Sequence, residues 1–188
     1  MKIIKIQQEQ ILLNSTSSTG GMGSTCATGA RTMTGLIDCL QTNIQTGSGG
    51  SCALTESLFN ALLQTIFEGG NGRPDIAFVN GFNKRRISAF ATANTRNIDM
   101  SNQNRLRNTV VAYMSDFGDI DIVLDRWVAK ADAPVLQMEK FKIAYLRKPF
   151  VQVLGITGDS KDAQIIAEYT LQYLNEASSG KLSALATS

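Results

Sequence analysis

The chain of 188 residues contains no histidine. Ser-His-Asp and Cys-His hydrolases, histidine-ligated metal sites and histidine general bases therefore cannot be built from this chain alone. Lysine chemistry and paired-carboxylate chemistry remain open. The three cysteines, Cys26, Cys39 and Cys52, lack Cys-x-x-Cys spacing, so we expect reduced, partly buried thiols and no structural zinc. The residues alone predict no catalytic, cofactor-binding or metal-binding residues.

Charge and aromatic residues are also scarce. Charged residues make up 18% of the chain and the net charge is +2, which is too little to indicate a nucleic-acid-binding surface. Aromatic residues make up 7%, without the clusters that an adhesin or receptor-binding module would need. No apolar run approaches the roughly 20 residues that cross a bilayer, and the first residues do not resemble a signal peptide. We therefore expect no membrane partner.

The first 53 residues contain little that predicts regular structure. Residues 1–13 resemble the end of a helix without a cap, which indicates a fragment whose beginning is missing or a short added leader. Residues 14–53 are rich in Gly, Ser and Thr around one apolar segment, residues 35–40, and we expect a surface loop. Gly20, Gly21 and Gly23 do not match a phosphate-binding loop, because no Gly-Lys-Ser/Thr follows them.

The middle of the chain predicts an α/β unit. Apolar residues at helical spacing predict a helix over residues 54–68, with Thr55 as N-cap and Gly69-Gly70 as its end. Residues 75–79 are almost wholly apolar, which is typical of a strand in the middle of a sheet. A turn at residues 80–83 and a short helix over 84–91, with Ile87 and Phe90 inward, are expected next. Residues 92–108 are expected to be an exposed loop.

A hairpin is predicted over residues 109–128. Val111, Tyr113, Ile120, Ile122 and Leu124 would line its apolar faces, and residues 116–119 would form its turn. The turn and the following strand also carry acidic residues, namely Asp116, Asp119, Asp121 and Asp125. Such a cluster can bind Mg²⁺ or Ca²⁺, which keeps a carboxylate- or metal-dependent enzyme as an alternative, but its spacing fits no EF-hand. We favour a solvated strand face.

The last third of the chain, residues 134–185, predicts an extended antiparallel ribbon. Ile143, Tyr145 and Arg147 would lie on one side of a strand, and Lys142, Ala144 and Leu146 on the other. A turn at residues 155–160 would join it to a second strand. The segment from Ile165 also fits a helix through Tyr169 and Tyr173. A two-stranded ribbon cannot bury both faces within itself, so it must pack on its own chain or on a neighbour.

The chain resembles the C-terminal part of tailed-bacteriophage major capsid proteins of the SU10-like family, which have the HK97-type capsid fold. The resemblance is carried by an ordered series of blocks: residues 53–60, 84–88, 95–96, 113–118, 124–127, 144–150, 157–160, 168–171 and 175–180. Lys148 departs from the pattern as an extra residue between an arginine and a proline.

The resemblance implies an α+β fold with an axial domain, built on a central mixed sheet with flanking helices, and a peripheral domain with a long β-ribbon. Residues 1–29 would be a remnant of the spine helix and a Gly/Ser/Thr-rich loop. Residues 30–133 would be mainly axial, and residues 134–188 would hold the return strands, the peripheral ribbon and the C-terminal tail. The N-terminal arm, the extended loop and most of the spine helix would precede this chain.

The resemblance further implies a structural, non-enzymatic subunit of an icosahedral phage or prophage head that encloses DNA. Its partners would be copies of itself in hexamers and pentamers, with scaffolding or portal proteins and at most non-specific DNA contact. It would assemble in the bacterial host cytoplasm and reside in the virion. An encapsulin-like compartment shell is the alternative within the same fold. Lys84, Arg85 and Arg86 would face packaged DNA or an acidic neighbour, although a solvated helix face is the favoured interpretation.

Overall fold

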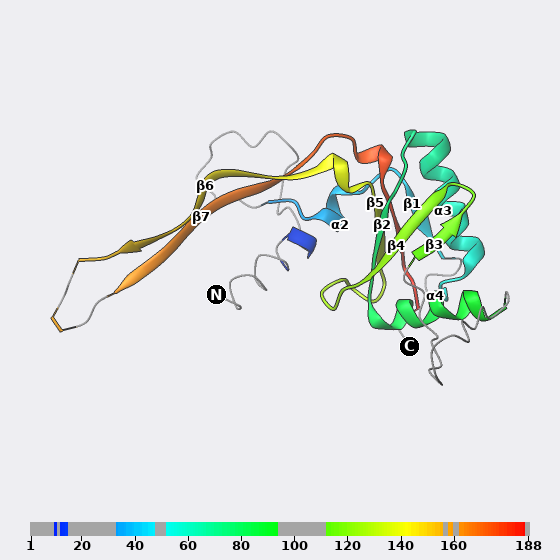
Figure 1. The fold of residues 1–188 in the computed structure, drawn as a ribbon, viewed down its shortest axis with the longest axis horizontal. Coiled ribbons are helices and arrows are strands. Elements are labelled where there is room, and N and C mark those ends of the chain that lie inside the picture. Colours follow the sequence, from blue (N-terminus) through cyan, green and yellow to red (C-terminus); the bar gives the residue numbers. More distant parts are fainter. Residues whose placement is uncertain are drawn as a thin grey trace, which may run out of the picture.

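A body with a projecting ribbon is the main feature of the computed structural model (Figure 1). The structure describes residues 10, 12–14, 33–47, 52–93, 112–155, 158–159 and 162–186. The predictions for Gly20, Gly21, Gly23 and Val111, for the loop over residues 94–108 and for most of residues 1–13 lie outside the described residues. Residues 10 and 12–14 are helical, in agreement with the expected helix end.

The body is built around a six-stranded mixed sheet. Its strands lie in the order β1 (Ile44–Thr46), β8 (Gly180–Ser183), β5 (Ala133–Leu136), β2 (Ile76–Val79), β4 (Gly118–Leu124) and β3 (Ala112–Ser115). The pairs β1–β8 and β2–β4 are parallel, and the other three pairs are antiparallel. β2 lies inside the sheet, as its apolar sequence predicts. In the sequence, β5 precedes the ribbon and β8 follows it, so the chain returns to the sheet after the ribbon.

One face of the sheet is covered by α3 (Glu56–Gly70) and α4 (Gly81–Ala93). The Thr55 hydroxyl caps α3 by accepting a hydrogen bond from the Leu58 N–H at 3.3 Å, as predicted. Apolar residues from both helices and four strands meet in one core: Leu54, Phe59, Leu62, Leu63, Ile66, Ala77, Val79, Ile87, Ile120, Ile122, Ala133, Val135, Leu182 and Leu185.

Both helices differ from the prediction at their ends. α3 includes Gly69 and Gly70, and it ends at Asn71, which has a positive φ of 47°. Phe67, one of the apolar residues at helical spacing, is 52% exposed near this end. α4 begins at Gly81, so the predicted turn at residues 80–83 is largely its first turn. The buried side-chain amide of Asn83 donates to the Lys130 carbonyl at 2.9 Å and fixes this turn against the body.

The β3–β4 hairpin is shorter than residues 109–128. Residues 116–117 form its turn, but β4 ends at Leu124, where its parallel pairing with Val79 of β2 ends. Leu124 lies on the same face as Ile120 and Ile122, as predicted, but is 62% exposed at the end of the strand. The chain turns away at Asp125, whose buried carboxylate accepts the Trp127 N–H at 2.8 Å.

A second apolar cluster covers part of the other face of the sheet. It includes α2 (Leu36–Cys39), Leu40 and Leu136, and the base of the ribbon packs against it. The prediction of a surface loop over residues 14–53 is therefore wrong for α2 and β1. The backbone N–H of Lys181 in β8 donates to the Asn43 carbonyl at 2.9 Å. This segment is therefore held in place by residues distant in the sequence. None of the helices in the described ranges is long and apolar enough to span a membrane.

Candidate functional site

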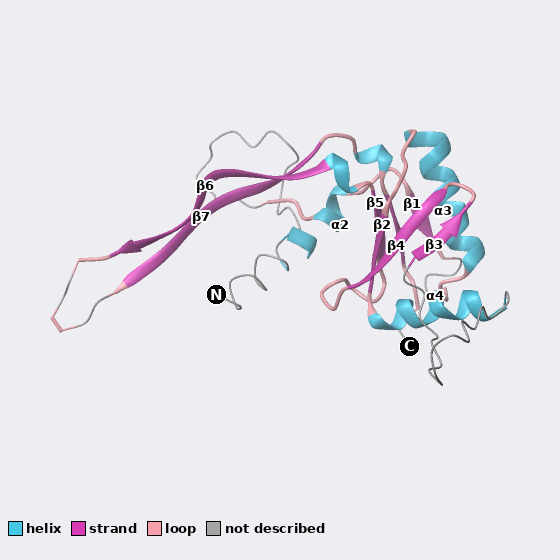
Figure 2. Ribbon diagram, viewed as in Figure 1, coloured by secondary structure: helices cyan, strands magenta, loops and turns pink. Residues whose placement is uncertain are grey.

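The ribbon consists of β6 (Phe141–Val153) and β7 (Ala163–Tyr173), which pair only with each other among the described strands (Figure 2). The prediction of an antiparallel ribbon is confirmed, and the helical alternative from Ile165 is wrong. Each strand keeps one edge without a strand partner in the described part of the chain. Such edges are templates for pairing with another chain.

Two irregularities interrupt the ribbon ladder. Tyr145 pairs with Tyr169 and Arg147 with Glu168, so β6 holds one extra residue, Leu146. A further extra residue lies between Arg147 and Phe150, which pairs with Ile166. The extra residue Lys148 therefore lies in a β-bulge beside Pro149. Proline has no backbone N–H to donate to the strand ladder and is tolerated at such a bulge.

The bulges change which side chains share a face. Arg147 forms an ion pair with its cross-strand neighbour Glu168, on the side of Thr170 and Gln172. Its predicted place beside Ile143 and Tyr145 is therefore wrong, because the prediction assumed unbroken alternation.

One face of the ribbon is apolar along its length. Strand alternation and the observed pairs place these side chains on it: Phe141, Ile143, Tyr145, Val151, Val153, Ala163, Ile165, Ala167, Tyr169, Leu171 and Tyr173. We call this set the apolar ribbon face. The opposite face carries these residues: Lys142, Ala144, Arg147, Phe150, Gln152, Gln164, Ile166, Glu168, Thr170 and Gln172.

Among the residues that the structure describes, those that cover the apolar ribbon face lie near the body. Phe141, Leu171 and Tyr173 pack against the α2 cluster. Farther out, the rings of Tyr145 and Tyr169 lie 6.1 Å apart, and the aliphatic side chains are exposed, with Val153 at 70%. A contiguous exposed apolar surface of this kind is typical of a protein–protein contact.

Glu176, in η2 (Glu176–Ser178), ties the end of the ribbon to the body. Its carboxylate accepts the N–H groups of Gln41 and Thr42 at 2.7 and 2.8 Å, and the Thr42 hydroxyl. Burial acts to raise the pKa of Glu176, but the hydrogen bonds from Thr42 and Gln41 outweigh it and hold the pKa below its ordinary value. The sequence gives no local signal for this anchor, because its partners lie more than a hundred residues earlier.

The acidic residues of the hairpin do not converge on a common ligand position. Asp116, Asp119 and Asp121 are exposed, whereas Asp125 is buried and bound to the Trp127 N–H. The described part of the chain contains no group of three or more His, Cys, Asp or Glu side chains placed to hold a metal ion. Cys39 and Cys52 are free thiols, and burial raises the pKa of Cys39 to about 11, while Cys26 lies outside the described residues.

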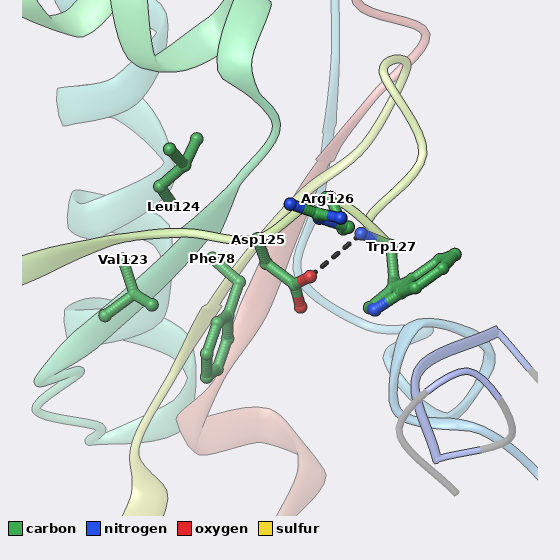
Figure 3. Close-up of a pocket in the computed structure, with 6 residues that line it drawn as sticks. All are labelled: Phe78, Val123, Leu124, Asp125, Arg126 and Trp127. Carbon is green, nitrogen blue, oxygen red and sulfur yellow. Dashed lines mark hydrogen bonds between the residues drawn. The ribbon is translucent and has the colours of Figure 1, made fainter. Parts of the chain in front are cut away.

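A pocket of about 250 Å³ lies where β4 ends (Figure 3). It is lined by Phe78, Val123, Leu124, Asp125, Arg126 and Trp127. The only carboxylate in this lining, that of Asp125, is already hydrogen-bonded to the backbone of Trp127. This arrangement offers a small recess rather than a set of groups that could activate a substrate.

A larger groove, of about 660 Å³, follows α4. It is lined by Phe82, Lys84, Arg85, Arg86, Ser88, Ala89 and Leu124. The Lys84 ammonium donates to the Ile122 carbonyl at 2.9 Å, and burial lowers its pKa. The Arg86 guanidinium lies 5.3 Å from the centre of the Phe82 ring. The groove therefore combines cationic groups with apolar surface.

The fold defined by this sheet, its helices and its ribbon is the HK97-type shell fold. It is similar to a subunit of the holo-SrpI encapsulin complex from Synechococcus elongatus PCC 7942, with a TM-score of 0.63 and 13% identity, covering 100% of this chain and 63% of that one. A virus-like particle from Pyrococcus furiosus gives a TM-score of 0.47 and 11% identity, over 95% of this chain and 64% of that one. The chain thus spans less than two thirds of the length of these solved relatives.

The family is established by sequence. The SU10 major capsid protein family matches residues 1–186, and the chain belongs to this family. No curated protein matches the chain. The family match agrees with the resemblance found in the sequence blocks and implies a structural role.

Proposed function

We propose that the chain forms the larger part of a structural subunit of an icosahedral phage or prophage head, which assembles from many copies of itself and encloses DNA. The family match supports this proposal, and the apolar ribbon face is the structural observation that carries it. Each aliphatic side chain of that face would contribute about 1–2 kcal/mol if a neighbour covered it. Many such contacts repeated around symmetry axes stabilise a closed particle.

The proposal includes the division of the chain. Residues 30–133 would form most of an axial domain, residues 134–188 would supply the return strands and the peripheral ribbon, and residues 1–29 would end a spine helix. Hexamers and pentamers would be the assembly units, and scaffolding and portal proteins would be further partners. Assembly would take place in the host cytoplasm, and the mature subunit would reside in the virion without catalytic activity.

Electron microscopy of the product of the complete reading frame tests the proposal. Expressed alone or with the neighbouring scaffold gene, the protein should form closed shells of uniform diameter. Only small monodisperse species under all expression and salt conditions would contradict the proposal.

An encapsulin-like shell is the second candidate, because the solved structure with a TM-score of 0.63 is an encapsulin. The two candidates share the fold and differ in what the shell encloses, which is DNA in a phage head and a cargo enzyme in a compartment. Terminase, portal and tail genes beside the reading frame would support a phage head, whereas a gene for a cargo enzyme would support a compartment.

A further inference from the structure

The groove along α4 is a second surface feature, separate from the ribbon. Arg85 and Arg86 are exposed along it, and the exposed side chain of Leu124, at the end of β4, forms part of its lining. Arg86 lies over Phe82, so one guanidinium is held in place by a ring instead of extending freely into water. The groove therefore presents a fixed cation beside apolar surface.

These features favour a protein partner over nucleic acid. Binding to a phosphate backbone depends on neutralising several phosphates with lysine or arginine. Here the Lys84 ammonium is directed to the carbonyl of Ile122, which leaves two arginines as the outward cations of the groove. Phe82, Ala89 and Leu124 would be covered by apolar side chains of a protein but not by phosphates.

The β3–β4 hairpin carries the complementary surface. Asp116, Asp119 and Asp121 are exposed, and Met114, which pairs with Asp119, is 79% exposed. In the part of the chain that the structure describes, the ion pair between the ribbon strands is the only salt bridge, so these carboxylates have no cationic partner there. The hairpin thus offers acidic groups beside an apolar side chain, as the groove requires.

The hairpin cannot reach the groove of its own chain. Asp119 and Asp121 alternate along β4 with Ile120 and Ile122, which pack in the same core as Ile87 of α4, so the two carboxylates lie on the sheet face away from α4. The strand is held between β2 and β3, so it cannot fold back on itself. A contact between the two surfaces must therefore join different chains.

We propose that the α4 groove binds the acidic β3–β4 hairpin of a second copy of this chain. Arg85 and Arg86 then face Asp119 and Asp121, and Met114 covers the apolar part of the groove. Because the two surfaces differ, the contact is heterologous, and repetition of it produces a ring when the rotation closes. The inference rests on the proposed shell function and specifies one contact within a ring of subunits.

Charge exchange tests this contact in the 188-residue chain by sedimentation velocity at low ionic strength. The Asp119→Arg/Asp121→Arg variant and the Arg85→Glu/Arg86→Glu variant should each associate roughly tenfold more weakly, or worse, than the unaltered chain. The chain with all four substitutions should recover most of the association, because opposite charges again face each other. Arg73→Glu/Lys130→Glu, which makes the same charge change at exposed residues outside the groove, is the control and should associate normally.

Circular dichroism melting first establishes that each variant is folded. A monomeric unaltered chain at every concentration, or additive losses in the fourfold variant, would overturn the contact. Binding of a single-stranded or duplex oligonucleotide that is lost only in the arginine variant, with the hairpin variant associating normally, would assign the groove to nucleic acid and also overturn the proposed contact.

If the full-length protein forms shells that no charge variant disturbs, the contact is wrong and the shell function stands. If it forms no shells while charge exchange still restores association, the shell function is wrong and the contact stands.

Discussion

The side chain of Glu176 links the end of the ribbon to the body. Glu176 receives two backbone N–H groups and one hydroxyl from residues 41 and 42, and its carboxylate is the charged member of every one of these hydrogen bonds. Hydrogen bonds to a charged group are stronger than those between neutral groups. Glu176 therefore helps to fix the position where the ribbon returns to the sheet, together with the Asn43 side-chain amide, which donates to the Ala177 and Ser179 carbonyls at 2.6 and 3.1 Å.

The first prediction concerns this carboxylate. The pKa of Glu176 in the folded chain is below its ordinary value of 4.5. Its contribution to the free energy of unfolding is therefore present above pH 4.5 and is lost as the pH falls through the folded pKa. Glu176→Ala should lower the free energy of unfolding at pH 7 by about 2 kcal/mol. Urea unfolding between pH 3 and pH 7 should show a shallower pH dependence in Glu176→Gln than in the unaltered chain, and Glu139→Gln, at an exposed position, serves as control. Equal slopes in all three proteins would contradict the role of Glu176.

The second prediction concerns two glycines at the end of α3. A Cβ on Gly72 would lie 2.4 Å from the Ser178 carbonyl oxygen, whereas one on Gly69 would meet only Asn43 Oδ1 at 3.8 Å. Gly72→Ala should therefore destabilise the chain by about 1–3 kcal/mol, because backbone must move apart. Gly69→Ala should stabilise it by about 0.5–1 kcal/mol, because alanine restricts the unfolded chain and favours the helix. Thermal unfolding measures both, and the same sign for both substitutions would show that α3 does not pack closely on η2.

Elements with a strong pattern were predictable from the sequence, and elements held by distant partners were not. The apolar periodicity of residues 54–68 predicted α3, and alternation predicted the ribbon, because each pattern extends over many residues. β1 and β8 are three and four residues long and exist through pairing with each other, so no local pattern marks them. Periodicity also cannot show a bulge, which is why Arg147 was assigned to the wrong face.

The third prediction concerns the bulge at Lys148. Deleting this residue should remove one irregularity and leave the outer register of the ribbon unchanged, since the bulge already separates the two registers. Val153 and Ala163 are paired and flanked by the Leu154–Asp162 hydrogen bond, so cysteines at these two positions should form a cross-strand disulfide. Peptide mapping should find this disulfide with and without Lys148. Loss of the disulfide only on deletion would show that Lys148 sets the register.

At the scale of the whole molecule, the family match implies a structural role for the chain. Charged residues make up only 18% of the chain, and in the part that the structure describes an exposed apolar surface lies on a ribbon that extends away from the body (Figure 1). The sequence predicted the ribbon, because the long alternating runs are visible without coordinates. It could not predict the acidic hairpin and basic groove as a pair, because their positions depend on the sheet.

The central claim is that neighbouring copies cover the apolar ribbon face, and the most direct measurement is electron microscopy of the complete protein with substitutions on the two ribbon faces. Val151→Ser/Val153→Ser/Ile165→Thr changes the apolar face, and Gln152→Ser/Gln164→Ser changes the opposite face as the matched control. All three substituted side chains of the first variant are exposed in the single chain, so its melting temperature should change little. The account predicts that shells are lost in the first variant and retained in the control. Normal shells from a folded apolar-face variant would contradict it.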